Sequence, residues 1–140
     1  MSLYLLDSDI LTLFSQGNPR VCQRVLNCPL SDLATSIVCV EEALSGWYGL
    51  LRKSKSDQQT VLAYRRMTET MVTLKGFPIR TFDLAAATRF HSLRAAKLRI
   101  GTNDLRIACS ALELGAVVVT RNRSDFAQVP GLQLQDWSQV

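Results

Sequence analysis

Short apolar runs alternate with longer amphipathic stretches along the whole chain. The runs at residues 4–6, 33–38, 79–82 and 116–120 have the length and the apolar content of buried strands, and residues 132–134 are a candidate edge strand. Apolar positions at helical spacing separate these runs. They predict helices at residues 10–14, 19–27, 40–51, 57–75, 84–98 and 104–113, with a polar turn at residues 121–125.

This alternation of strands and helices predicts an α/β fold. We expect a three-layer sandwich with a central, mostly parallel sheet of about four or five strands and helices on both faces. The chain has 140 residues and shows no internal repeat or linker, so residues 1–140 are expected to form a single domain. In such sheets the ligand site lies at the carboxyl ends of the strands.

Acidic residues gather at that predicted rim, because they follow strands or open helices beside them: Asp7, Glu42, Asp104 and Asp125. Carboxylates forced together repel one another unless a proton or a cation lies between them. Hard oxygen ligands without histidine or cysteine suit Mg²⁺ or Mn²⁺. A cation held in this way can activate water against a phosphodiester, which is nuclease chemistry.

Each acid also has a purely structural interpretation. Asp7 could cap the following helix, and for Asp9 we favour the capping role at the helix that begins at Ile10. Asp104 would be favoured by the dipole of its helix, and Asp125 could stabilise its own turn. For each acid alone, the structural interpretation is at least as well supported as a functional site. Acids at so many junctions between elements are hard to explain as independent structural features, so the set favours a site.

Composition narrows the class of protein. Hydrophobic residues make up 47% and charged residues 20% of the chain, as in folded globular proteins. No apolar run approaches the roughly 20 residues that cross a bilayer, and the first run lacks the basic start of a signal peptide, so we expect no membrane segment and a cytoplasmic location. A lone His91 and four scattered cysteines make Cys/His zinc sites and histidine triads poor candidates: Cys22, Cys28, Cys39 and Cys109.

Charge is distributed unevenly along the chain. The net charge is +4, but residues 43–103 alone carry +8 and the remainder carries −4. A basic surface beside an acidic pocket suits an enzyme that grips a polyanion and cuts it with metal ions. The alternative is that the Lys and Arg side chains merely solvate exposed helix faces, and charge alone favours this alternative.

Four stretches of the chain, in order and at matching spacing, resemble those of PIN-domain ribonucleases, especially the VapC-type toxins of bacterial toxin–antitoxin systems. They are residues 4–11 (YLLDSDIL), 36–46 (SIVCVEEALSG), 102–108 (TNDLRIA) and 119–126 (VTRNRSDF). The resemblance covers nearly the whole chain. It implies a metal-dependent endoribonuclease with Mg²⁺ or Mn²⁺ as cofactor and RNA as substrate.

The resemblance also implies roles for individual residues. The four acids Asp7, Glu42, Asp104 and Asp125 match the catalytic, metal-binding positions of the family, and Glu42 is preferred to Glu41 because Gly46 follows it by four positions. Three polar residues match positions that support the acids in relatives: Ser8, Thr120 and Asn122. Asp9 stands where many relatives have Asn, and Glu41 is an additional acid beside Glu42; the sequence leaves both of their roles open.

Partners follow from the same resemblance. A VapC-type toxin is restrained by a cognate antitoxin protein and forms a homodimer. Residues 47, 48, 50 and 51, an apolar group at the end of the helix that carries Glu42, are either core or an exposed patch for a partner. Basic residues of the middle region are candidates for gripping the RNA backbone: Arg94, Lys97 and Arg99.

Two alternative functions fit parts of the sequence. The Asp7-Ser8-Asp9 stretch also resembles the start of haloacid-dehalogenase-type phosphatases, but no Lys follows Lys97 and the chain has no room for a cap domain. A catalytically degenerate PIN-like module that only binds RNA or protein is the second alternative, and the presence of all four acids argues against it.

Overall fold

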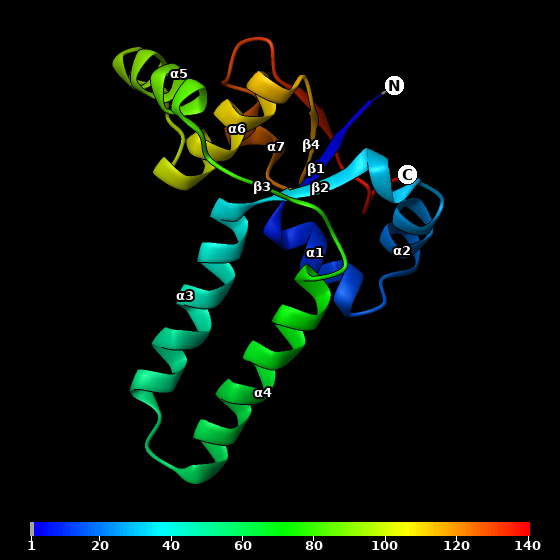
Figure 1. Cartoon of the computed structure of the whole chain (residues 1–140), viewed down its shortest axis with the longest axis vertical. Coiled ribbons are helices and arrows are strands. Elements are labelled where there is room, and N and C mark those ends of the chain that lie inside the picture. Colours follow the sequence, from blue (N-terminus) through cyan, green and yellow to red (C-terminus); the bar gives the residue numbers. More distant parts are fainter. Residues whose placement is uncertain (1) are drawn as a thin grey trace.

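A computed structural model describes residues 2–140 and contains one five-stranded sheet in which all strands are parallel. The strand order is β3-β2-β1-β4-β5. The strands are β1 (Tyr4–Leu6), β2 (Leu33–Ser36), β3 (Ile79–Arg80), β4 (Val117–Val119) and β5 (Gln133–Gln135). Figure 1 shows the sheet in the upper part of the molecule. The predicted α/β sandwich with a parallel sheet is confirmed.

Alternation along the central strands divides the core between the two faces of the sheet. Leu5 of β1 and Val118 of β4 are paired neighbours and belong to one buried cluster, which also contains Leu105 and Phe126. Leu6 and Val119, the next paired positions, belong to a second cluster. Because successive side chains of a strand point to opposite faces, each face of this short sheet has its own apolar core.

Helices cover both faces. The cluster on the face of Leu6 includes residues of α1 (Ser8–Ser15) and α2 (Pro19–Leu26). The cluster on the face of Leu5 includes residues of α5 (Leu84–Ala95), α6 (Thr102–Leu114) and the short α7 (Arg123–Phe126). A 3₁₀ helix, η1 (Leu30–Asp32), precedes β2. None of the helices in residues 2–140 combines the length and the apolar character needed to span a bilayer.

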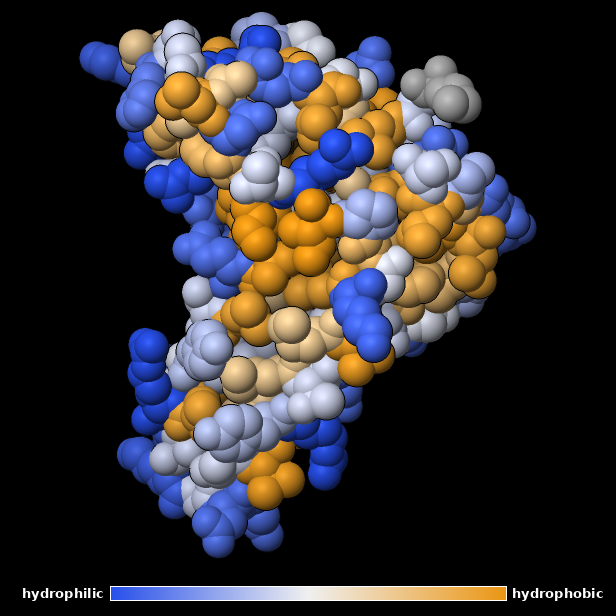
Figure 2. All heavy atoms as spheres, in the orientation of Figure 1, coloured by the Kyte–Doolittle hydropathy of each residue, from blue (hydrophilic) through white to orange (hydrophobic). Residues whose placement is uncertain are grey.

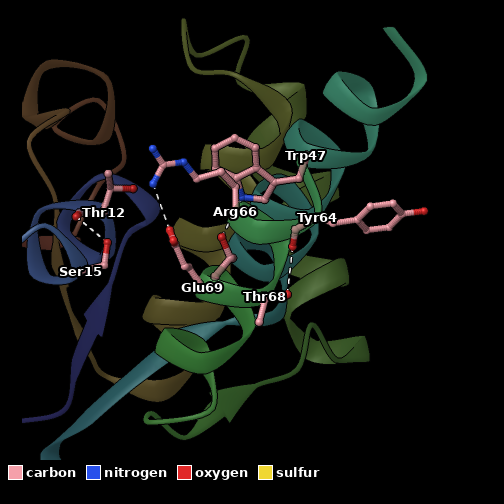
Figure 3. A network of polar contacts seen from close by, with 8 residues as sticks. Thr12, Ser15, Trp47, Tyr64, Arg66, Thr68 and Glu69 are labelled. Carbon is pink, nitrogen blue, oxygen red and sulfur yellow. Dashed lines mark hydrogen bonds and ion pairs between the residues drawn. The ribbon is translucent and has the colours of Figure 1, made fainter. Parts of the chain in front are cut away.

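Two long helices, α3 (Ile37–Lys53) and α4 (Asp57–Leu74), form a hairpin that extends away from the sheet (Figure 1). The Trp47 Nε1–H of α3 donates a hydrogen bond of 2.7 Å to Thr70 Oγ1 of α4. Figure 3 shows the Trp47 side chain in this region, near the Arg66–Glu69 ion pair of α4, while the ring of Tyr64 points away from it. Trp47 is therefore a half-buried hairpin residue, whereas Tyr48 and Leu50 are 45% and 51% exposed.

Local differences from the predicted elements have simple causes. The second strand ends at Ser36, because the Ser36 side chain caps α3 and accepts from the Val38 N–H, so residues 37 and 38 are helical. The polar turn predicted at residues 121–125 is wrong in part, since α7 begins at Arg123. The helix predicted to end at residue 113 ends at Leu114, and Gly115 follows it with a left-handed φ of 64° that favours glycine.

Candidate metal centre at the edge of the sheet

The carboxyl ends of the strands bring the four predicted acids into one cluster. Asp7 follows β1, Glu42 lies in α3, Asp104 lies in the first turn of α6, and Asp125 belongs to α7. Ligand atoms of Asp7 and Glu42 lie within 4.8 Å of each other. The charge of Asp104 raises the pKa of both, and one amide group joins Asp104 to Asp125.

Asp7 is the most buried of these acids, with 7% of its surface exposed. As the N-cap of α1 it accepts from the Ser8 N–H through Oδ1 at 2.8 Å, and the Thr120 hydroxyl donates to its Oδ2 at 2.8 Å. Burial raises its pKa to about 6, and the negative charges of Asp9 and Asp104 add to this effect. The carboxylate is held in place while its charge is poorly compensated.

Glu42 lies in the acid cluster, as predicted, and Glu41 does not. The Ser8 hydroxyl donates to Glu42 Oε1 at 3.3 Å, whereas the Glu41 side chain is exposed. Burial, followed by the charge of Asp104, raises the pKa of Glu42. Since adjacent helical residues point about 100° apart, only one of the two glutamates faces the cluster.

The remaining predicted residues form a chain of hydrogen bonds behind the acids. The Asn122 side-chain amide donates to Asp104 Oδ2 at 3.0 Å and to Asp125 Oδ2 at 3.1 Å. The Asn122 backbone N–H donates to Thr120 Oγ1, which itself donates to Asp7. Burial is the main cause that raises the pKa of Asp104, and the charge of Asp125 also contributes. Thr120 and Asn122 therefore couple acids that come from three different elements.

The capping role favoured for Asp9 is wrong. Asp7 is the N-cap of α1, and Asp9 lies inside the first turn of that helix. Its Oδ2 accepts from the Arg121 N–H at 3.0 Å, while its Oδ1 is buried and has no hydrogen-bond partner within residues 2–140. Asp9 thus ties the start of α1 to the turn that follows β4. Burial is the main cause that raises its pKa.

Sequence reasoning missed Cys39 as a neighbour of this cluster. Its thiol lies 3.7 Å from Asp7 Oδ1, and its sulfur lies within 4.8 Å of ligand atoms of Asp7 and Glu42. Burial, followed by the charge of Asp7, raises the pKa of Cys39 to about 12, so the group is a thiol at neutral pH. The signal was available, because residues three apart on a helix share a face and Cys39 precedes Glu42 by three.

The donor set fits a hard divalent cation. The acids present oxygen atoms, and the raised pKa values show that the ionised forms lack compensation. Within the described part of the chain, the ion pairs are Arg66–Glu69 and Arg89–Glu113, so no Lys or Arg side chain forms an ion pair with the cluster. A bound cation would supply the missing positive charge.

The predicted RNA-contacting residues lie outside this cluster. Arg94 is exposed in the last turn of α5, and Lys97 and Arg99 are exposed in the segment between α5 and α6. The Arg99 backbone is fastened on both sides, because its N–H donates to Gln128 Oε1 and its carbonyl accepts from Gln128 Nε2. Their RNA contacts stay a prediction.

The model of the PIN domain family matches residues 4–132. The chain belongs to the PIN-domain family. This PIN domain is 31% identical to ribonuclease VapC1 of Haemophilus influenzae (strain R2866), over 97% of its own length and 98% of the relative. It is 27% identical to the tRNA(fMet)-specific endonuclease VapC of Shigella flexneri, over 99% of its length and all of the relative's.

Solved structures agree with this membership. The DNA-bound VapBC of Salmonella typhimurium superposes on this PIN domain with a TM-score of 0.79 at 25% identity, covering 98% of this chain and 99% of the other. VapBC2 of Rickettsia felis bound to a promoter DNA fragment gives a TM-score of 0.76 at 25% identity, covering 96% and 98%. The expected fold and the resemblance to VapC ribonucleases are therefore confirmed.

Proposed function

We propose that this PIN domain is a divalent-metal-dependent endoribonuclease and the toxin of a toxin–antitoxin pair. The observation that carries the proposal is the buried Asp7 carboxylate, whose pKa is raised to about 6 among further acids with which no Lys or Arg side chain of residues 2–140 forms an ion pair. Such a cluster is unfavourable without a cation, and oxygen donors select Mg²⁺ or Mn²⁺. The relatives of this chain include a ribonuclease and a tRNA(fMet)-specific endonuclease, which supports RNA as the substrate.

In this proposal Asp7, Asp104 and Asp125 hold the cation, and Glu42 ligates it directly or through water. When bound, the cation neutralises charge at the phosphodiester and makes water a better nucleophile. Glu42 would help to position the attacking water, a role that its raised pKa and the nearby charge of Asp104 favour. In-line attack at phosphorus leaves 5′-phosphate and 3′-hydroxyl ends, and no side chain acts as a covalent nucleophile.

Neighbouring polar groups set the geometry of the acids. The Ser8 hydroxyl orients Glu42, and the Thr120 hydroxyl orients Asp7. The Asn122 side-chain amide donates to both Asp104 and Asp125 and so fixes these two carboxylates relative to each other. These bonds are made to carboxylate oxygens whose second lone pairs stay available for a ligand. Ser8, Thr120 and Asn122 are thus positioning residues in this account, because each acts through an acid.

Different residues are candidates for contacting the substrate and the inhibitor. Arg94, Lys97 and Arg99 are candidates for the RNA backbone, to which they would contribute affinity without sequence preference. The related solved structures are of VapBC bound to DNA, which supports a cognate antitoxin for this chain. Its apolar contact would include Tyr48 and Leu50, which are exposed on α3. We also propose a homodimer, the form that the family resemblance implies.

A titration of RNA cleavage with metal tests the proposal. Wild-type protein is incubated with RNA in EDTA and then in increasing Mn²⁺ or Mg²⁺, with Asp104→Asn as the matched variant. Cleavage should require the metal, should fail in the variant, and should leave ends that a 5′-phosphate-dependent exonuclease degrades. Intact RNA at every metal concentration, with binding retained, would instead favour the catalytically degenerate module.

A further inference from the structure

Arg94 of α5 and Arg106 of α6 lie on two helices that pack against each other (Figure 1). The second of these helices, α6, also carries Asp104 of the acid cluster. Arg106 stands in α6, one turn after Asn103, and its Nη1 donates to Asn103 Oδ1 at 3.3 Å. The Asn103 side chain also lies near Glu42, since it lowers the pKa of that carboxyl group. Arg106 is therefore connected to the acid cluster through a single side chain.

The aromatic ring of Phe90 contacts two guanidinium groups, those of Arg106 and Arg94. The guanidinium carbon of Arg106 lies 5.5 Å from the centre of the Phe90 ring, and that of Arg94 lies 5.6 Å from the same centre. Phe90 packs against the core of this layer, so it is a firm support. Cation–π contact orients both guanidiniums but leaves their charges unpaired.

Neither charge is compensated by an acid. The ion pairs within residues 2–140 are Arg66–Glu69 and Arg89–Glu113, and neither involves Arg94 or Arg106. Two like charges that share one ring repel each other, and an anion placed between or beside them relieves this repulsion. The planar, five-donor guanidinium is the side chain best suited to a phosphate.

We propose that Arg106 and Arg94, oriented by Phe90, bind the RNA backbone. They would contact phosphate groups that neighbour the phosphodiester bond to be cut. The proposal rests on the proposed function and extends it, since Arg106 was absent from the sequence-based candidates. RNA is the occupant because Arg106 follows Asp104 by two residues on α6, so a strand cut at the acid cluster would pass close to the pair. The Phe90 ring already holds two cations, so the pair reads the backbone rather than stacking a base.

Arg89 provides a matched control. It lies on the same helix as Arg94 and carries the same charge, but its Nε donates to Glu113 Oε1 at 2.9 Å. Replacing any of the three arginines by Gln changes the net charge equally. Gln at position 106 keeps a polar N–H donor on an uncharged side chain, so the Arg106→Gln variant loses the charge without becoming apolar. Any effect confined to Arg94 and Arg106 therefore reports their position.

The experiment measures steady-state cleavage of a fluorescein-labelled single-stranded RNA in Mn²⁺ at several salt concentrations. Arg106→Gln and Arg94→Gln should each raise KM roughly three- to tenfold and leave kcat within about twofold. Each should make the plot of log(kcat/KM) against log salt shallower by about 0.7. Arg89→Gln should match wild type in KM, and Arg106→Lys should recover the salt slope. A melting curve checks that each variant is folded. If the Arg106→Gln variant unfolds, the Arg94→Gln variant tests the proposal by itself, because Arg94 is exposed.

Two results would overturn the proposal. The first is equal kinetics for Arg94→Gln, Arg106→Gln and Arg89→Gln. The second is unchanged RNA kinetics together with weakened binding of polyglutamate, which would assign the pair to an acidic protein partner. Failure of the proposed function looks different, because wild type would then cleave no RNA with either metal. Fluorescence anisotropy of the same labelled RNA in EDTA would still compare the variants in that case.

Discussion

The Thr120 hydroxyl donates a 2.8 Å hydrogen bond to Oδ2 of Asp7, and both groups are buried. Thr120 follows β4 and Asp7 follows β1, strands that pair in parallel register, so the bond joins two carboxyl ends of the sheet. The same hydroxyl accepts from the Asn122 N–H at 3.0 Å. One side chain thus links the most buried acid to Asn122, whose amide donates to Asp104 and Asp125.

Thr120→Val should raise the pKa of Asp7 further, because the hydrogen bond from Thr120 lowers it in the wild type. Valine keeps the shape but removes the donor, so the ionised carboxylate loses stabilisation. We expect the acidic limb of the pH profile of kcat/KM to move to higher pH. Thr120→Ser retains the hydroxyl and should keep the wild-type profile, and identical profiles for Val and wild type would contradict the role of this bond.

Asp7→Asn should stabilise the metal-free protein at neutral pH. Because the pKa of Asp7 is raised from 3.8 to about 6 in the folded state, the wild type loses stability as pH rises through this interval and carries the full penalty above it. Asn keeps the N-cap of α1 and removes the charge. Urea unfolding in EDTA should show a gain of roughly 1–3 kcal/mol at pH 7.5 that vanishes near pH 4.

The opposite pH dependence, or a loss of stability at pH 7.5, would show that the Asp7 charge is compensated in the folded protein. The measurement needs no metal and no substrate. It therefore tests the electrostatics of the cluster separately from its chemistry.

Glu42→Gln should damage cleavage far more than Glu41→Gln. Glu42 accepts from the Ser8 hydroxyl and senses the charge of Asp104, whereas Glu41 is exposed. Loss of one ligand or of the group that positions water typically costs two orders of magnitude or more in rate, so we expect a drop of about a hundredfold for Glu42→Gln. Comparison of kcat/KM for the two variants decides it, and the reverse ranking would move the functional glutamate by one residue.

Trp47→Phe should loosen the α3–α4 hairpin without abolishing folding. Phenylalanine removes the N–H that donates to Thr70 and leaves the hydroxyl without that partner. The expected loss is about 1 kcal/mol in urea unfolding.

The double change Tyr48→Glu and Leu50→Glu, at exposed positions, should by contrast leave stability intact and weaken antitoxin binding. An equally large loss of stability from that double change would make these side chains structural.

Local signals carried much of the fold. An apolar run closed by Asp7 predicts a buried strand with an acid at its end, and Gly115 predicts the end of α6; both are observed. The boundary at Ser36 was missed because a serine that caps a helix also fits a strand, and only the hydrogen bond to Val38 decides between them.

The interior of the site was harder to predict because its contacts are long-range. The four acids were predicted from their places at element junctions, and the structure gathers them. That Asn122 holds two acids together depends on how α6 and α7 pack, which no local pattern encodes. Asp9 was misassigned for the same reason, since its partner, the Arg121 N–H, belongs to the turn after β4.

The most direct test of the account is a calorimetric titration of the wild-type protein and of Asp7→Asn and Asp104→Asn with Mn²⁺. The acid cluster predicts saturable binding to the wild type and at least a tenfold weaker affinity in each variant, because each loses one ligand charge. Glu41→Gln should bind as wild type does. Equal Mn²⁺ affinity in all of these proteins, or none in the wild type, would contradict the assignment of this cluster as the metal centre of the nuclease.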